Sequence, residues 1–348
     1  MSVGAISSPH LLLLSGIGPR QELEAVGVAC LADAPHVGKH LQDHLMCPLI
    51  YPAPGIGVPM NDVVLAMGPD ALHGPAGPLP TDSAADANLS PELLALKQGA
   101  ERRLAEWQAT GRGLGASSLA DAVVFCSSGL GDLPRHDTEI ICFVTGGNND
   151  FLRTIINIDT SRFFGDAVAR VANDAENLQL LANPVLPRSR GEIVLDSADP
   201  AAPPVIRMNY YDPHDMRVMV AAIRRTMDIA AHWPGNRKLG ALMVPPFLAK
   251  KHGYREGAEP SDALLEDFAL HFSLTVYHPT STCRIGDVVD PRLRVKEIGR
   301  LRVADASVMP AVIGGNTNAA SIMIGEKAAE MIAAEHGVRL AEFVGERV

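Results

Sequence analysis

A histidine in a rigid stretch of small residues is the first candidate for chemistry. His278 precedes Pro279 in the stretch VYHPTSTCRIG, residues 276–286, and the proline favours an extended backbone at the histidine. An imidazole titrates near neutral pH and can accept a proton from a reacting group. The same stretch is also typical of a buried histidine whose ring nitrogens are satisfied by hydrogen bonds. The motif taken alone favours this structural interpretation.

Two glycines and two asparagines precede a long apolar stretch further along the chain. Gly314 and Gly315 allow close backbone approach, and Asn316 and Asn318 occupy positions typical of helix caps. The N-terminus of a helix presents free N–H groups and a partial positive charge. This helix start could therefore stabilise negative charge on a bound cofactor. In the alternative interpretation both asparagines only cap the helix and turn the chain.

The elements that must position these residues are a mixture of helices and strands. Hydrophobic periodicity, start signals and stop signals define them. The predicted strands cover 28–31, 137–146 and 191–197, and the predicted helices cover 8–14, 90–110, 214–233, 261–272 and 319–335. This order of elements predicts a mixed α/β protein.

Three of these helices carry more detailed expectations. Ser8 is expected to cap the first helix, with Pro9 at its first helical position. Ser261 is expected to cap the helix over 261–272 in the same way. The last helix, over 319–335, is mostly apolar, and we expect it to be buried on most sides.

Length and composition are those of a globular protein with two domains. The chain has 348 residues, of which 47% are hydrophobic and 20% are charged. Its net charge of −10 argues against nucleic acid or an anionic membrane surface as the main partner. No apolar run approaches the ~20 residues that a membrane helix needs, so no integral membrane segment is expected.

The five cysteines are scattered, at positions 30, 47, 126, 142 and 283. They form no C-x-x-C pair and have no metal-ligand spacing. The sequence therefore favours a reduced, cytoplasmic setting, and no metal site is expected.

Five motifs lie in residues 4–18, 37–44, 186–215, 277–286 and 303–330. Together they resemble the glucose–methanol–choline (GMC) flavin oxidoreductases, in particular the choline-dehydrogenase-like members. One of them is VGKHLQDH, in which the family usually carries asparagine at the position of His40. They are spread over residues 4–330 of the chain, and chance agreement at all five is very improbable.

The resemblance implies an α/β (α+β mixed) fold with two functional parts. An FAD-binding domain would be built from residues 1–45 and from the returning segment 285–348. A substrate domain with an antiparallel sheet would be built from residues 46–284. The implied activity is FAD-dependent oxidation of a primary alcohol to an aldehyde, in which hydride passes from the substrate to the flavin.

The resemblance also implies roles for the two candidate catalytic residues. By motif position, His278 corresponds to the active-site histidine of the family and would act as the general base for the substrate hydroxyl. Asn316 falls where the family has a histidine or asparagine that hydrogen-bonds the substrate oxygen. For His40 and His44 the structural interpretation is preferred.

The same resemblance implies a cofactor-binding set near the last helix. Gly315 and Asn318 would lie at the flavin-contacting end of that helix, whose dipole favours the anionic reduced flavin. Asp305 and Ala306 would form a turn near the ribityl–phosphate part of FAD.

The glycine-rich loop that binds the ADP half of FAD in this family does not occur in the sequence. The stretch GRGLGA, residues 111–116, is no substitute, because a predicted helix precedes it and its last position is alanine. We therefore expect an incomplete FAD-binding domain, as in the C-terminal portion of a GMC enzyme. Taken alone, the chain is expected to bind FAD weakly or not at all, and a separate N-terminal half or a homo-oligomer could complete it.

Two alternatives to alcohol oxidation stay open at this point. The chain could be an inactive remnant or an interaction subunit, or it could catalyse non-redox chemistry of the hydroxynitrile-lyase type. Choline itself is disfavoured as the substrate, because a quaternary ammonium site usually has an aromatic cage and only 5% of the residues are aromatic. The electron acceptor could be oxygen or a quinone-like carrier.

Overall fold

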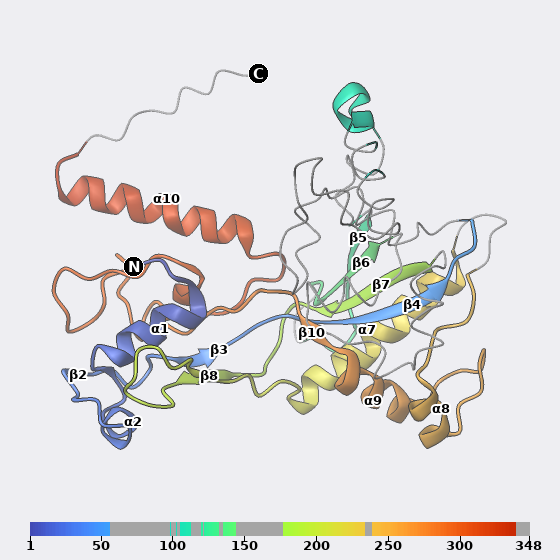
Figure 1. Cartoon of the computed structure of the whole chain (residues 1–348), viewed down its shortest axis with the longest axis horizontal. Helices are drawn as coiled ribbons and strands as arrows, with labels where there is room; N and C mark the ends of the chain where they lie inside the picture. The colour runs from blue at the N-terminus through green and yellow to red at the C-terminus, as the bar shows by residue number, and fades with distance from the viewer. Residues whose placement is uncertain are drawn as a thin grey trace. The chain divides into compact units, whose positions relative to one another are not determined.

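The computed structural model describes two compact units of the chain (Figure 1). The described residues are 1–55, 98, 102, 105–112, 120, 122–131, 135–143, 177–233 and 239–338. Unit 1 comprises Met1–Leu45, Pro184–Arg217 and Leu274–Val348, and unit 2 comprises Met46–Asn183 and Val218–Ser273. Helices and antiparallel sheets occur together, which confirms the expected mixed fold class. The expected assignment of an FAD-binding domain and a substrate domain stays a prediction.

Unit 1 is assembled from short elements that are distant in sequence. Its elements are α1 (Gly4–Leu14), β1 (Ile17–Gly18), α2 (Arg20–Ala25), β2 (Ala32–Asp33), β3 (Lys39–Leu41), β8 (Gly191–Val194), β9 (Val205–Arg207), β10 (Leu274–Thr275), the 3-10 helix η4 (Ala306–Val308) and α10 (Asn318–Glu335). Strands β1 and β2 pair in parallel, and β3, β8 and β9 form an antiparallel sheet in that order. Its core includes Leu12, Leu13, Val37, Val303 and Val308.

Helix α1 begins at Gly4, so the expected start at Ser8 was wrong. The Ser8 hydroxyl does not cap the helix and instead donates a 2.5 Å hydrogen bond to Oδ2 of Asp305. Pro9 lies inside the helix, where it has no N–H to give to the carbonyl of Ala5. The hydroxyl of Thr282 fills that role with a 2.6 Å bond to the Ala5 oxygen. Partners distant in sequence thus stabilise a helix that local signals placed four residues later.

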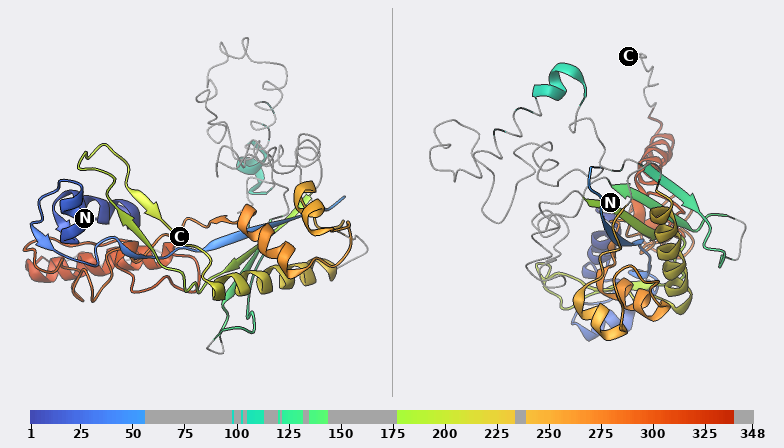
Figure 2. Two further views of the ribbon diagram at one scale, coloured as in Figure 1. Left: turned by 90° about the horizontal axis from the view of Figure 1, so that it is seen from below. Right: turned by 90° about the vertical axis from the view of Figure 1, so that its right-hand side faces the viewer.

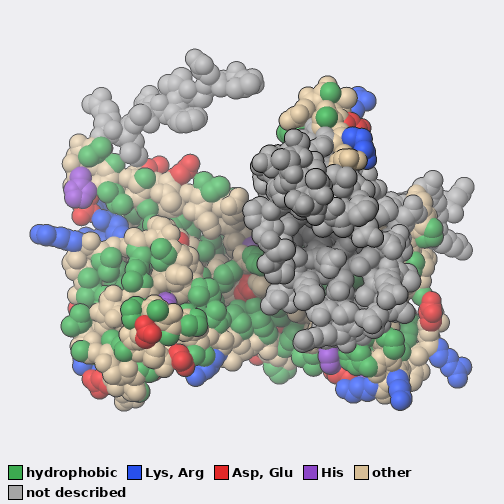
Figure 3. All heavy atoms as spheres, viewed as in Figure 1, with side chains coloured by type: hydrophobic (Ala, Val, Ile, Leu, Met, Phe, Trp, Pro, Cys, Tyr) green, Lys and Arg blue, Asp and Glu red, His purple; other side chains and the backbone are tan. Residues whose placement is uncertain are grey.

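Two further expectations were wrong. The strand expected over 28–31 lies at β2 instead, because pairing of Ile17 with Ala32 sets the register. The last helix, α10, is not buried on most sides: Ile322 and Met323 are 56% and 50% exposed, and only Ile324, Ala328 and Ala333 are buried. Figure 2 shows α10 as one long helix, and Figure 3 shows hydrophobic side chains at the surface along it. The core of unit 1 covers a single stripe of the helix.

The described part of unit 2 contains an antiparallel sheet and several helices. Its strands are β4 (Leu45–Pro52), β5 (Ala122–Cys126), β6 (Thr138–Phe143) and β7 (Asn177–Pro184), and its helices are α7 (Pro213–Ala231), α8 (Pro246–His252) and α9 (Asp262–Phe272). Strands β4, β7, β6 and β5 are neighbours in that order. The register runs from Cys47 opposite Ala182 to Pro52 opposite Asn177.

Most of the helix expected over 90–110 lies outside the described residues. The other expectations from periodicity are confirmed. Strands β6 and β8 lie within 137–146 and 191–197, and α7 and α9 match the helices over 214–233 and 261–272. The Ser261 hydroxyl accepts a hydrogen bond from the Leu264 N–H and caps α9 as expected.

Candidate active site

Three consecutive buried polar residues, Gln42, Asp43 and His44, follow β3 in unit 1. The Gln42 side chain donates to the Pro187 carbonyl at 2.8 Å and accepts from the Val312 N–H at 3.2 Å. Its backbone exchanges two hydrogen bonds with Thr280, of 3.2 and 2.8 Å. One glutamine therefore holds three segments that are far apart in the sequence around the same point.

Asp43 fixes the backbone at His278. Its Oδ1 accepts the His278 N–H at 2.9 Å, and its Oδ2 accepts the hydroxyls of Thr275, at 2.5 Å, and Tyr210, at 2.7 Å. Burial, with the charge of Asp43, raises the pKa of Tyr210, so the phenol stays protonated and donates. Every hydrogen-bond donor in this set is directed at one carboxylate, which makes the position of His278 well defined.

The backbone around His278 is also strained. Tyr277 and Ser281 both lie in the left-handed region, with φ of 61° and 74°. Such conformations persist only where surrounding contacts determine them, and they cluster at functional sites. His278 itself is buried, with 8% of the residue exposed.

The rings of His44 and His278 meet edge to face. Nδ1 of His44 lies 2.9 Å from Nδ1 of His278, and the ring planes are 83° apart. Nε2 of His44 lies 3.0 Å from the Val185 carbonyl oxygen, which can only accept, so Nε2 carries the hydrogen. A neutral His44 then has a lone pair on Nδ1, and His278 must donate its Nδ1–H to it.

This arrangement leaves a lone pair on Nε2 of His278. Among the described residues no hydrogen bond to that nitrogen is found. Burial lowers the pKa of His278, while the nearby Asp43 charge acts in the opposite direction. Burial, with His278 beside it, lowers the pKa of His44 to about 4. Both rings are therefore neutral near pH 7, and the geometry presents Nε2 of His278 as a proton acceptor.

The other residues expected at the site lie around the start of α10. The N-cap residue is Thr317, whose side chain makes no capping hydrogen bond. Asn316 precedes the N-cap residue and Asn318 is already the first helical residue, so neither occupies the N-cap position of the alternative interpretation; both side chains are exposed. Gly315 is half-buried, with open space where a side chain would stand.

Asp305 and Ala306 lie at the start of η4. Asp305 accepts three hydrogen bonds within the chain: Oδ2 from the Gly4 N–H and the Ser8 hydroxyl, and Oδ1 from the Ser307 N–H. The carboxylate thus ties α1 to η4. This structural use of Asp305 was not expected from the sequence.

The sequence analysis missed most of the residues that position His278. His44 was interpreted as structural without a partner, and Gln42 and Asp43 were not singled out. The available signal was a run of three polar residues, QDH, directly before the apolar stretch of β4. Its significance depends on contacts with residues about 235 positions away.

Comparison with known proteins decides the family. A GMC oxidoreductase C-terminal model matches residues 187–325, and the corresponding N-terminal model matches residues 1–46. The chain belongs to the GMC oxidoreductase family. Both segments of that match contain residues of the candidate site, since His44 lies in the first and His278 in the second.

Relatives and solved structures agree with this assignment. An alcohol dehydrogenase [acceptor] of Pseudomonas putida is 33% identical over 347 residues, covering 95% of this chain and 50% of the relative. An oxygen-dependent choline dehydrogenase of Rhizobium etli is 32% identical over 339 residues, covering 95% and 51%. A structure of formate oxidase from Aspergillus oryzae has a TM-score of 0.69 at 25% identity, over 97% of this chain and 54% of that one.

These comparisons define a flavoprotein oxidoreductase family. GMC oxidoreductases are FAD-binding flavoproteins, and the names of the relatives are those of oxidoreductases. The chain spans about half the length of the curated relatives it matches. Within the described residues, none of the helices has the length and apolar character needed to cross a membrane.

Proposed function

We propose that the protein formed with this chain oxidises a primary alcohol to an aldehyde with FAD, and that Nε2 of His278 accepts the hydroxyl proton. The observation that supports this most strongly is the contact between His44 and His278, from which the tautomer of His278 follows. The Val185 carbonyl orients His44, and His44 holds the hydrogen of His278 on Nδ1. The other nitrogen of His278 is then a neutral base at physiological pH.

The residues at the start of α10 fit an electron-rich group of the cofactor. The helix has 18 residues, its N-cap side chain makes no capping bond, and Asn318 in its first turn is exposed. Unsatisfied N–H groups and the helix dipole favour negative charge at that point. We therefore propose Gly315 and Asn318 as cofactor contacts, and FAD, when bound there, supplies the hydride acceptor.

Asp305 would act differently from the other cofactor residues. Three hydrogen bonds from Gly4, Ser8 and Ser307 already occupy its carboxylate. We propose that it holds the turn containing Ala306 in position, and that any contact of this turn with the cofactor is made by Ala306 and the backbone.

Asn316 completes the proposed catalytic pair. Asn316 is exposed and lies at the end of the loop over 312–316. This loop begins next to the candidate site, because the Val312 N–H donates to the Gln42 side chain. We propose that the Asn316 amide donates a hydrogen bond to the substrate oxygen while His278 accepts the proton. Names such as alcohol dehydrogenase and choline dehydrogenase among the relatives support an alcohol as the substrate class.

The setting and the electron acceptor are part of the proposal. The structure describes all five cysteines, and none of them forms a disulfide, which supports a reducing, cytoplasmic setting. Oxygen or a quinone-like carrier would reoxidise the flavin, and comparing oxygen consumption with reduction of a quinone-like dye separates the two.

The test measures bound flavin and turnover on the same preparation. The 348-residue chain is purified alone and together with a polypeptide that supplies a G-x-G-x-x-G dinucleotide-binding unit. We expect flavin absorbance and dye reduction with primary alcohols from the combination, and little of either from the chain alone. Tightly bound FAD with turnover by the chain alone would contradict the expected need for that unit. Flavin binding by the combination without alcohol-dependent reduction would contradict the proposed activity.

A further inference from the structure

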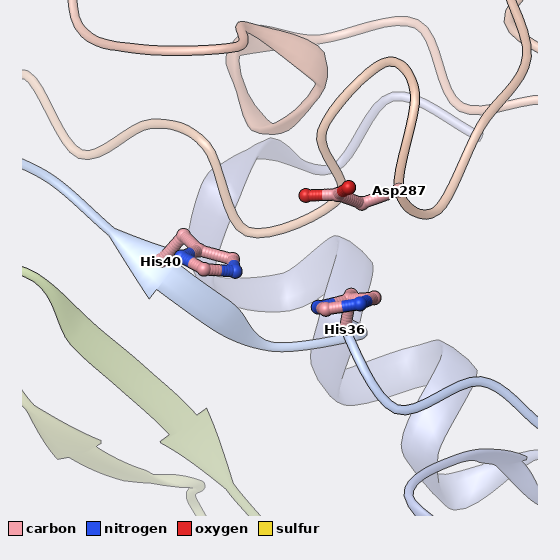
Figure 4. Close-up of side chains that lie close together, drawn as sticks. All are labelled: His36, His40 and Asp287. Carbon is pink, nitrogen blue, oxygen red and sulfur yellow. The ribbon is translucent and has the colours of Figure 1, made fainter.

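Three side chains of unit 1 that play no part in the proposed chemistry converge on one point. His36, His40 and Asp287 each place a potential ligand atom within 4.8 Å of the others. The rings of His36 and His40 are stacked, with centroids 5.7 Å apart and planes at 25°. Figure 4 shows the Asp287 carboxylate extending towards the two rings from a separate loop. His36 is exposed and the other two are half-buried, so the point is accessible from solvent.

An irregularity of β3 directs His40 to this point. The β3–β8 register shifts between Lys39 and Leu41, and His40 between them has φ of 64°, in the left-handed region. A bulge of this kind turns a side chain away from the regular alternation of the strand. Gly38, two residues before His40, donates its N–H to the Thr282 carbonyl. This hydrogen bond holds residues 38–40 against the segment that leads to Asp287.

Arg284 orients the Asp287 carboxylate. Its Nε donates to Oδ2 of Asp287 at 2.9 Å, and its Nη2 forms an ion pair with the same oxygen. Within the described part of the chain no hydrogen bond to Oδ1 is found. Arg284 therefore fixes the carboxylate by one oxygen and leaves the other available to a ligand.

We propose that His36, His40 and Asp287 bind one divalent transition-metal ion of the zinc class. Two imidazoles and one carboxylate suit zinc and similar ions, and water can supply a fourth ligand. Tetrahedral coordination with metal bonds of about 2.0–2.2 Å places ligand atoms about 3.4 Å apart. The His36 side chain is exposed, so its ring can rotate and bring its ligand atom closer to those of His40 and Asp287.

The ion would cross-link two segments that are about 250 residues apart in the sequence. Residues 36–40 lead into β3 and include its first two residues, and Asp287 lies in the turn that follows Arg284. The sequence analysis expected no metal site because it considered the cysteine spacing alone. The positive charge of Arg284 beside Asp287 opposes a second cation, so we expect moderate affinity rather than the tight binding of a buried structural zinc site.

Metal titration of the full 348-residue chain tests the proposal without flavin or substrate. After chelator treatment, binding of Zn²⁺ is measured by calorimetry at about pH 7.5, where neutral histidines can act as ligands. His36→Gln removes an exposed ligand, and His40→Asn removes a ligand while asparagine still tolerates the left-handed backbone. Asp287→Asn retains the shape of the carboxylate. The matched control is His232→Gln, because His232 is also an exposed histidine close to an aspartate, Asp228.

We expect one Zn²⁺ per chain, with affinity lowered at least ~10-fold in each of the three ligand variants and unchanged in the control. Mg²⁺ and Ca²⁺ should not compete, because these ions prefer oxygen ligands. Circular dichroism verifies that the variants are folded. Lack of Zn²⁺ binding by the chelator-treated protein would overturn the proposal. It would also be overturned if the folded His36→Gln and His40→Asn variants bound Zn²⁺ with the affinity of the parent chain. Neither result depends on whether alcohol oxidation is confirmed.

Discussion

Nδ1 of His44 and Nδ1 of His278 lie 2.9 Å apart, in a buried contact between residues separated by 234 positions. Only one hydrogen can occupy that contact while both rings are neutral. The Val185 carbonyl accepts from the other nitrogen of His44, so the hydrogen belongs to His278. A backbone carbonyl thereby determines which nitrogen of His278 can accept a proton from a substrate.

Replacing His44 with phenylalanine should change the tautomer of His278. The aromatic volume is retained, but Nδ1–H of His278 loses its hydrogen-bond acceptor. The Nδ1–H tautomer of His278 is then no longer stabilised over the Nε2–H tautomer. Imidazole ¹⁵N chemical shifts of the histidine-labelled chain at neutral pH measure the two tautomers. We expect an Nδ1–H form in the parent chain and a mixture, or the Nε2–H form, in the variant. The exposed His232→Gln variant is the control. An unchanged His278 spectrum in His44→Phe would refute the proposal that His44 determines the tautomer of His278.

Replacing His278 with alanine should lower kcat of the flavin-loaded protein by ~10²–10⁴, as expected for loss of a general base. The FAD content should hardly change, because the proposed cofactor contacts lie at the start of α10. Steady-state kinetics and flavin absorbance of the same samples measure the two effects. His232→Ala is the control for replacement of a histidine. A loss of activity below about tenfold would rule out the assignment of His278 as the base.

The bond from the Thr282 hydroxyl to the Ala5 carbonyl should be coupled energetically to Pro9. Thr282→Val leaves that buried carbonyl without a donor and should lower the free energy of unfolding by about 1–3 kcal/mol. In a Pro9→Ala background the same change should cost about 1 kcal/mol less, because the new alanine has a backbone N–H that can donate to Ala5 within the helix. Urea unfolding of the parent, the two single variants and the double variant gives the coupling.

The control for the Thr282 experiment is Ser15→Ala. The Ser15 hydroxyl also donates to a carbonyl of α1, that of Leu11, but at an exposed position and without a proline nearby. It should show little coupling to Pro9. Equal costs of Thr282→Val in both backgrounds would mean that the hydroxyl does not substitute for the N–H that proline lacks.

Stability should fall as His44 becomes protonated. Burial, with His278 beside it, lowers the pKa of His44 from 6.5 to about 4, so the unfolded chain binds more protons than the folded chain between these values. The free energy of unfolding should therefore decrease as the pH falls from about 6.5 to about 4, by up to about 3 kcal/mol from this group. Denaturant unfolding across that range measures the change. The carboxylates contribute equally in the parent and His44→Gln chains, so the free energy of unfolding of the variant should decrease less steeply as the pH falls. The same dependence on pH in both chains would contradict the prediction.

The sequence by itself determined the elements whose signals are local. The amphipathic pattern over 214–233 and the Ser261 cap predicted α7 and α9, and alternation predicted β6 and β8. These signals act over a few residues, since helix periodicity and capping depend on neighbours within one or two turns. The sequence also singled out His278 and the segment before α10, because small residues, proline, glycine and asparagine concentrate there.

Tertiary structure alone decided where α1 begins, how far α10 is buried and what surrounds His278. Asp305 and Thr282 supply hydrogen bonds that let α1 start at Gly4 and continue through Pro9. The apolar composition of α10 does not specify how many of its sides other parts of the chain cover. The partner of His278 is His44, and the convergence of His36 and His40 with Asp287 likewise joins distant segments. Contacts of this kind depend on register, bulges and strained loops, which arise only when the chain is folded, and no local pattern encodes them.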